Sequence, residues 1–174
     1  MELKEKVKSL AKELHQQTIN IRRHLHRHPE LSFQEHKTAA FVSKRLKEMG
    51  LEPKENVAGT GVTAIIKGNG DNEKVIALRA DMDALPITEA NEVSYKSKNE
   101  GVMHACGHDV HTASLLGAAS ILQSVKNDLK GSVKLVFQPG EERIPGGASL
   151  MIKDGVLQNP RPTSIVGQHV MPFL

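Results

Sequence analysis

The sequence predicts an α/β domain in which helices pack on a mostly parallel or mixed β-sheet. Four short apolar segments, at 61–68, 73–80, 132–138 and 163–168, are typical of strands. Longer segments place apolar residues at helical spacing. Two helices come first and helices then alternate with strands, an order that favours helices packed on a sheet.

The N-terminal part is predicted to form two amphipathic helices. The first covers residues 3–25, and Pro29 ends it. The second covers residues 34–49, and Gly50 follows as its C-cap.

The remaining elements alternate in type. The strands at 61–68 and 73–80 are joined by a polar turn at 68–72, and residues 84–107 are expected to be irregular. A third helix is predicted at 110–125 with Asp109 as its cap. The later segments are an apolar strand at 132–138, expected to be buried on both faces, a short helix at 147–154 and a strand at 163–168.

Composition excludes several classes of protein. The 174 residues suffice for one domain, and one Tyr, four Phe and no Trp argue against a platform for stacking nucleic-acid bases. The net charge of +3 is mild, and no apolar run reaches membrane-spanning length, so neither nucleic acid nor membrane is expected as a partner. The single cysteine excludes an intrachain disulfide, and the N-terminus lacks the apolar core of a signal peptide, so we expect a cytoplasmic protein.

Residues of the metal-ligand types follow the predicted strands. Ligands of open α/β sheets bind outside the carboxyl ends of the strands, so these side chains should meet at one edge of the sheet. They are Asp81 and Asp83, Glu141 and Glu142, His169, and a group before the third helix, His104, Cys106, His108, Asp109 and His111.

The segment "HACGHDVH" is the sharpest local signal. Cys106 and His108 flank Gly107, where the backbone can bend, so a thiolate and an imidazole could face one zinc ion. The alternative is a small buried cysteine beside polar groups that cap the helix.

The segments "FQPGEE" and "LRADMDALP" supply carboxylates. Glu141 and Glu142 would repel each other, and a metal would relieve this if one is a ligand and the other a general base. The alternative is an exposed acidic turn. Asp81 and Asp83 are candidates for accepting the second ring N–H of metal-bound histidines, or else they cap backbone N–H groups at a loop entry.

A third histidine-rich segment lies near the end of the first helix. His24 and His28 share a helix face, whereas His26 points away from them. A metal site is possible here, but we favour satisfied or exposed histidines at a helix end.

Five motifs in this order, "HRHPELSFQE", "LRADMDALP", "HACGHDVHTA", "FQPGEE" and "GQHV", closely resemble the aminoacylase and carboxypeptidase-like metallopeptidases over residues 20–172. The similar branch comprises amidohydrolases such as hippurate hydrolases, N-acyl-L-amino acid amidohydrolases, N-acetyl-diaminopimelate deacetylases and auxin-conjugate hydrolases. The resemblance implies two divalent ions (zinc, manganese, cobalt or nickel), with Cys106, His108, Glu142 and His169 as metal ligands. It also implies that Glu141 is the catalytic base and that Asp83 supports a ligand.

The resemblance also implies a zinc-peptidase-like catalytic domain, of which residues 1–174 would be the N-terminal portion. We expect a truncated chain, because a further metal-binding histidine and an inserted lid and dimerisation domain, through which a full-length protein could form a homodimer, are missing from it. The expected reaction is metal-assisted hydrolysis of an N-acyl amino acid, with Glu141 moving the proton.

Two alternatives to this function stay open. One is a thiol hydrolase that uses Cys106 with His108 or His104. The other is a catalytically incomplete metal-binding fragment or interaction module derived from the family.

Overall fold

The structure is a computed structural model that describes residues 2–70 and 74–171. The chain forms one five-stranded mixed sheet with the strand order β1-β2-β4-β3-β5. The strands are β1 (Lys54–Val57), β2 (Gly61–Lys67), β3 (Val75–Asp81), β4 (Ser132–Gln138) and β5 (Ser164–Gly167). The helices are α1 (Leu3–Arg27), α2 (His36–Glu48), α3 (His108–Ser124) and α4 (Gly147–Lys153), with a short 3-10 helix at Lys126–Asp128.

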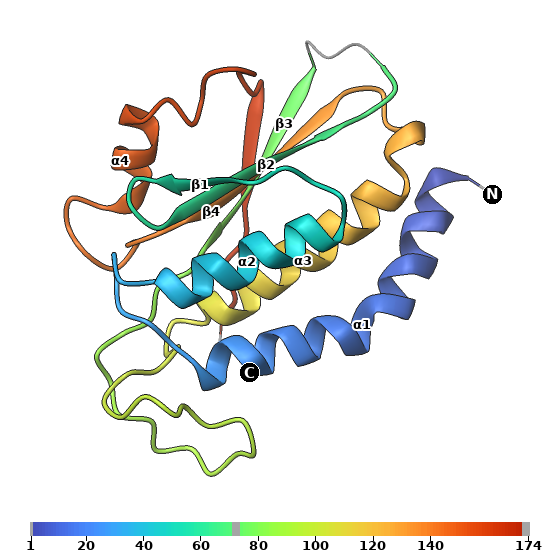
Figure 1. Cartoon of the computed structure of the whole chain (residues 1–174). Helices are drawn as coiled ribbons and strands as arrows, with labels where there is room; N and C mark the ends of the chain where they lie inside the picture. Colours follow the sequence, from blue (N-terminus) through green and yellow to red (C-terminus); the bar gives the residue numbers. More distant parts are fainter. Residues whose placement is uncertain (1, 71–73, 172–174) are drawn as a thin grey trace.

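The helices lie on both faces of the sheet (Figure 1). Helices α2 and α3 pack on one face, and α1 packs against α3 further from the strands. Leu46 of α2 and Leu116 of α3 meet Ile66 and Phe137 of the sheet in the main apolar core. Helix α4 covers the opposite face, where Met151 contacts a smaller core. The predicted α/β architecture with a mixed sheet is therefore confirmed.

Strand β4 is the centre of the sheet. It pairs in parallel with β3 and antiparallel with β2, and most of its side chains are buried, as its apolar sequence predicted. Strand β3 also pairs in parallel with β5, whose side chains are exposed. Strands β3, β4 and β5 therefore end at the same edge of the sheet.

Three local predictions differ from the structure or fall outside it. Strand β1 was missed because Lys54–Val57 is polar and largely exposed, without the alternation that marks a half-buried strand. Helix α3 begins at His108 rather than at residue 110, after Gly107 at φ +91°, so Asp109 lies inside the first turn and is not the predicted cap. Residues 71–73, which hold part of the predicted turn and the start of the predicted strand, lie outside the described residues.

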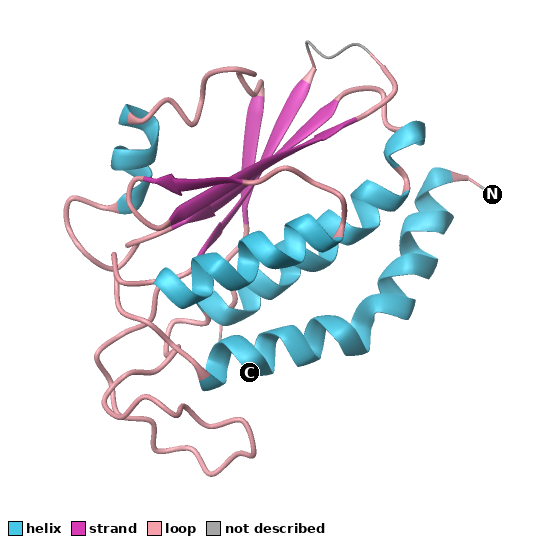
Figure 2. Cartoon of the chain, in the orientation of Figure 1, coloured by secondary structure: helices cyan, strands magenta, loops and turns pink. Residues whose placement is uncertain are grey.

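A long loop between β3 and α3 projects beyond the helices (Figure 2). It is irregular, as predicted, and two isolated bridges, Leu31 with Ala84 and Leu85 with Met103, tie it to the rest of the chain and to itself. No helix in the described parts of the chain combines the length and apolar character needed to cross a membrane.

His26 joins this loop to two helices. Its Nδ1 lies 2.8 Å from Asp109 Oδ2 on α3, and its Nε2 lies 3.0 Å from Glu89 Oε1 in the loop. Because both ring nitrogens face carboxylates, both can donate hydrogen bonds only in the charged ring. The bond to Asp109 is the largest cause that raises the pKa of His26 above 6.5, and the bond to Glu89 adds to it. The prediction of a satisfied histidine at the helix end is confirmed for this residue.

The raised pKa of His26 predicts a pH-dependent contribution to stability. A group with a raised folded-state pKa stabilises the fold fully below its unfolded pKa and loses that contribution as pH rises through the folded value. Replacing His26 with Gln should lower the free energy of unfolding by about 3 kcal/mol at about pH 6, because a buried charge pair is broken. The difference from the unsubstituted chain should narrow as pH rises through the raised pKa of His26.

Urea unfolding at several pH values measures both quantities. His15→Gln, at an exposed position on the same helix, is the control and should leave the stability nearly unchanged at every pH. A difference for His26→Gln that widens as pH rises would contradict the assignment of a charged ring.

Candidate metal centre

Four segments meet at the edge of the sheet where β3, β4 and β5 end. Asp81 ends β3 and Asp83 follows it, the turn with Glu141 and Glu142 follows β4, and the segment with His169 follows β5. The start of α3 brings His108, and the loop before it brings Cys106. The side chains form overlapping groups whose ligand atoms lie within 4.8 Å of one another: Cys106, His108 and His169; His108, Glu141 and Glu142; and Asp81, His108 and His111.

His108 is common to all three groups and is fully buried. Its Nδ1 lies 2.9 Å from the carbonyl oxygen of Asp83 and 3.2 Å from Asp83 Oδ1. Both partners are acceptors, so Nδ1 carries a proton, and Nε2 is the nitrogen that could bind a metal in the neutral ring.

Nε2 of His108 is surrounded by acidic groups at distances too long for hydrogen bonds. It lies 3.8 Å from Glu142 Oε1, 3.8 Å from Asp81 Oδ1 and 4.0 Å from Glu141 Oε2. This buried nitrogen has no hydrogen-bond partner among the described residues. Ligand atoms that share an ion at about 2.0–2.3 Å lie roughly 3–4 Å apart, so the spacing fits a divalent metal.

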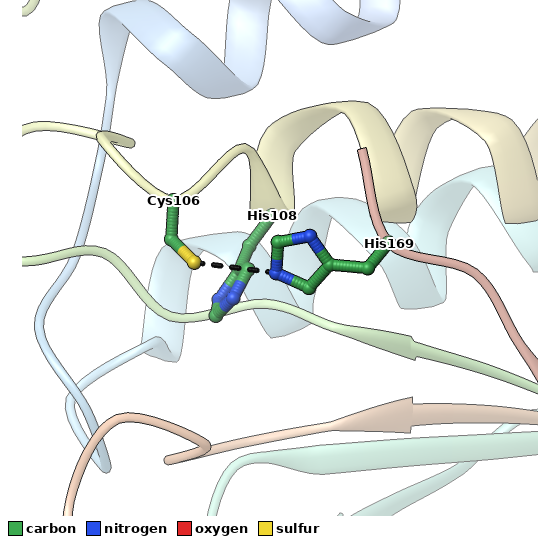
Figure 3. A group of neighbouring side chains, drawn as sticks. All are labelled: Cys106, His108 and His169. Atoms are coloured by element: carbon green, nitrogen blue, oxygen red, sulfur yellow. Dashed lines mark hydrogen bonds between the residues drawn. The ribbon is translucent and has the colours of Figure 1, made fainter. Parts of the chain in front are cut away.

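Cys106 and His169 complete this cluster from the exposed side (Figure 3). Cys106 Sγ lies 3.3 Å from His169 Nε2, and His169 Nδ1 lies 2.6 Å from the carbonyl oxygen of Val170. The Nδ1 of His169 therefore donates to the backbone, and its Nε2 is left facing the thiol.

The charges around Cys106 also fit a cation. Burial and then the nearby carboxylates of Glu142, Glu141 and Asp81 raise the pKa of the thiol to about 12. A thiolate forms at neutral pH only if a positive charge compensates these groups, as a metal ion would. The same environment argues against the thiol-hydrolase alternative, since a nucleophilic cysteine needs a lowered pKa.

His104 does not support the thiol-hydrolase alternative either. Burial lowers its pKa to about 4, and neither ring nitrogen has a hydrogen-bond partner in the part of the chain that the structure describes.

Asp83 and Asp81 contact different histidines. Asp83 contacts His108, while Asp81 Oδ1 lies 2.5 Å from His111 Nδ1 and its other oxygen pairs with Arg79 at 2.7 Å. Asp81 Oδ1 also faces His108 Nε2, so this carboxylate borders the space where an ion would lie.

The sequence analysis placed His111 near the site but gave it no role. Its Nε2 accepts the N–H of Val170 at 3.0 Å, so its Nδ1 donates to Asp81. His111 therefore links Asp81 to the segment that carries His169. Its position three residues after His108, on the same helix face, was the signal available in the sequence.

Asp83 holds three parts of the site together. Its Oδ2 accepts the hydroxyl of Ser32 at 2.6 Å and the N–H of Glu142 at 3.0 Å. Burial alone would raise the pKa of Asp83, but the bonds from His108, Ser32 and the backbone of Glu142 and Glu141 lower it to about 2. The carboxylate therefore stays charged over the whole physiological range.

Comparison with known proteins gives a consistent set of relatives. Residues 77–174 match the family described as Peptidase family M20/M25/M40. An N-acyl-L-amino acid amidohydrolase of Geobacillus stearothermophilus is 47% identical over 96% of this chain and 44% of the relative. A hippurate hydrolase of Campylobacter jejuni is 49% identical over 88% of this chain and 39% of the relative.

The fold also matches solved structures. The YXEP protein of Bacillus subtilis, described as a dinuclear metal binding peptidase from the M20 family, aligns with a TM-score of 0.86 and 48% identity over 92% of this chain and 44% of that chain. The chain thus spans less than half the length of these relatives.

The position of Asp83 generates a prediction for metal binding. Asp83→Ala removes the carboxylate that accepts from Ser32 and Glu142 and one of the two acceptors of His108, so zinc affinity should fall roughly 10- to 100-fold. Titration calorimetry on the folded variant measures this loss. Asp154→Ala is the matched control. The Asp154 carboxylate also accepts a backbone N–H, that of Ala58, but it lies on the α4 side of the sheet. Equal affinities for the Asp83 variant and the unsubstituted chain would remove Asp83 from the site.

Proposed function

The chain belongs to peptidase family M20/M25/M40, and from this membership and the site we propose that the protein is a metal-dependent amidohydrolase acting on N-acyl amino acids. The observation that carries the proposal is the buried Nε2 of His108. This nitrogen lacks a hydrogen-bond partner among the described residues and faces three carboxylates at 3.8–4.0 Å. Such an arrangement is costly unless a cation occupies the space between these groups.

Four residues would hold the metal. Cys106, His108 and His169 supply one sulfur and two imidazole nitrogens, and Glu142 supplies a carboxylate. Thiolate and imidazole favour zinc, whereas the carboxylates also suit manganese, cobalt or nickel. The acidic groups that face His108 on two sides, Asp81 and Glu141, support a centre for two ions.

Glu141 is the proposed general base. Its side chain is 42% exposed and lies beside the His108 nitrogen, so it can meet both solvent and a substrate at the site. A divalent ion supplies polarisation of the acyl carbonyl and a more acidic water. Glu141 would take a proton as water adds to the acyl carbonyl, and would deliver it to the nitrogen of the leaving amino acid as the amide C–N bond breaks.

The substrate class is supported by the relatives. Those named N-acyl-L-amino acid amidohydrolase, N-acetyl-L-cysteine deacetylase and hippurate hydrolase all point to small amides of amino acids. A reducing cytoplasmic compartment would keep the Cys106 thiol free for metal. We also propose that the full-length protein forms a homodimer.

A second candidate function is metal binding without catalysis. The specific observation in its favour is that Cys106, His108 and His169 form a ligand group that does not include Glu141, the proposed base. Under this reading the chain binds at most one ion, weakly, and does not turn over N-acetyl or N-benzoyl amino acids. Calorimetry with zinc and manganese, run beside an assay of those substrates, separates the two functions.

The role of Glu141 generates a direct prediction. Glu141→Gln should keep zinc bound but lower metal-dependent hydrolysis of N-acetyl amino acids by about 100-fold or more, because the proton acceptor is lost. Release of the free amino acid measures the rate, and metal analysis of the same sample measures occupancy. Glu92→Gln, at a highly exposed glutamate, is the control. An unchanged rate would exclude Glu141 as the base, and lost zinc would make it a ligand.

A further inference from the structure

The segment that joins α1 to α2 lies against the turn that carries the two glutamates. This segment, "PELSFQE" at 29–35, belongs to the first of the five sequence motifs, but none of its residues has a part in the chemistry proposed above. Its side chains contact both ends of the turn at Gly140–Glu142 and thereby suggest a role for the motif.

Glu35 holds the beginning of this turn. It is 0% exposed, and its Oε1 accepts the N–H of Gly140, the residue directly before Glu141, at 2.7 Å. Its Oε2 accepts the hydroxyl of Thr60 at 2.5 Å. Burying a carboxylate is costly unless its oxygens are hydrogen-bonded, so these two bonds restrict where the turn can lie.

Phe33 closes the space over the same glycine. A Cβ atom added at Gly140 would lie 2.4 Å from atoms of the Phe33 ring. Both residues have positive φ, +54° for Gly140 and +64° for Phe33, and the latter value is uncommon outside glycine. Such a conformation persists only where the surroundings enforce it, so the contact is specific.

Ser32 acts on the end of the turn through Asp83. Its hydroxyl donates to Asp83 Oδ2, and the same oxygen accepts the N–H of Glu142. The segment therefore fixes the turn on both sides of Glu141, directly at Gly140 and through Asp83 at Glu142.

We propose that Ser32, Phe33 and Glu35 form a turn clamp that positions Glu141 and Glu142, and that Glu35 is its principal positioning residue. This inference rests on the proposed function, which assigns the two glutamates to base and metal ligand. A base and a ligand that are adjacent in sequence must point in different directions, and small displacements of such groups are costly for catalysis. The clamp restricts the backbone between them.

The test compares Glu35→Ala with Glu35→Gln in the 174-residue chain. Glutamine keeps an oxygen for the N–H of Gly140 and gains an N–H that can donate to Thr60, so it should preserve the clamp. Alanine leaves the N–H of Gly140 unpaired. We expect the amide hydrogen of Gly140 to exchange at least about tenfold faster in the alanine variant than in the unsubstituted chain, as measured by NMR without metal. Zinc affinity should fall roughly 10- to 100-fold in the same variant.

A double variant separates positioning from general loss of stability. If Glu35 acts through Glu142, Glu35→Ala should cause little further loss of zinc affinity in the Glu142→Gln background. Ser43→Ala, in α2, is the control, because it removes a different hydrogen bond, from the buried Ser43 hydroxyl to Glu55. It should change thermal stability but neither Gly140 exchange nor zinc affinity.

Each outcome decides the inference. Unchanged exchange at Gly140 in Glu35→Ala, or the same loss of zinc affinity in both backgrounds, would overturn it. An unsubstituted chain that binds no zinc would contradict the proposed function, while the exchange rate of Gly140 still decides whether Glu35 holds the turn. If Glu35→Ala does not fold, Phe33→Ala, at a half-buried position, should accelerate the same exchange and weaken zinc binding, and no change in either would overturn the clamp.

Discussion

The candidate site depends on one buried carboxylate, that of Asp83. It accepts hydrogen bonds from the His108 ring, the Ser32 hydroxyl and the backbone of Glu142, groups that come from α3, from the segment before α2 and from the turn after β4. Because these partners keep Asp83 ionised, its geometry is the same at any physiological pH. The orientation of the His108 ring, and with it the direction of Nε2, follows from Asp83, whose backbone carbonyl and carboxylate both accept from Nδ1.

The second constraint is the balance of charge. Asp81, Glu141 and Glu142 surround His108 Nε2, and they also raise the pKa of the Cys106 thiol. Arg79 pairs with Oδ2 of Asp81, whereas His111 contacts Oδ1, the oxygen that also faces His108. A divalent cation would neutralise the negative charge of the carboxylates around this space. The same carboxylates therefore disfavour a free Cys106 thiolate but favour a thiolate that is bound to a metal ion.

Much of the fold could be predicted because its signals are local. The apolar run of β4 shows burial on both faces, and the polar residues after β3, β4 and β5 show which edge of the sheet carries the site. Strand β1 has no such pattern. Contacts between residues distant in the sequence could not be predicted either. Asp109 resembled a helix cap, but its carboxylate contacts His26, 83 residues away. Glu35 accepts the N–H of Gly140 across 105 residues.

X-ray absorption at the zinc edge tests the central claim most directly, namely that Cys106, His108, Glu142 and His169 share an ion. The account predicts one sulfur neighbour at about 2.3 Å and nitrogen or oxygen neighbours at about 2.0 Å in the zinc-loaded chain. The sulfur neighbour should disappear in Cys106→Ser, because this is the one cysteine of the chain. A zinc environment without sulfur in the unsubstituted chain would contradict the account.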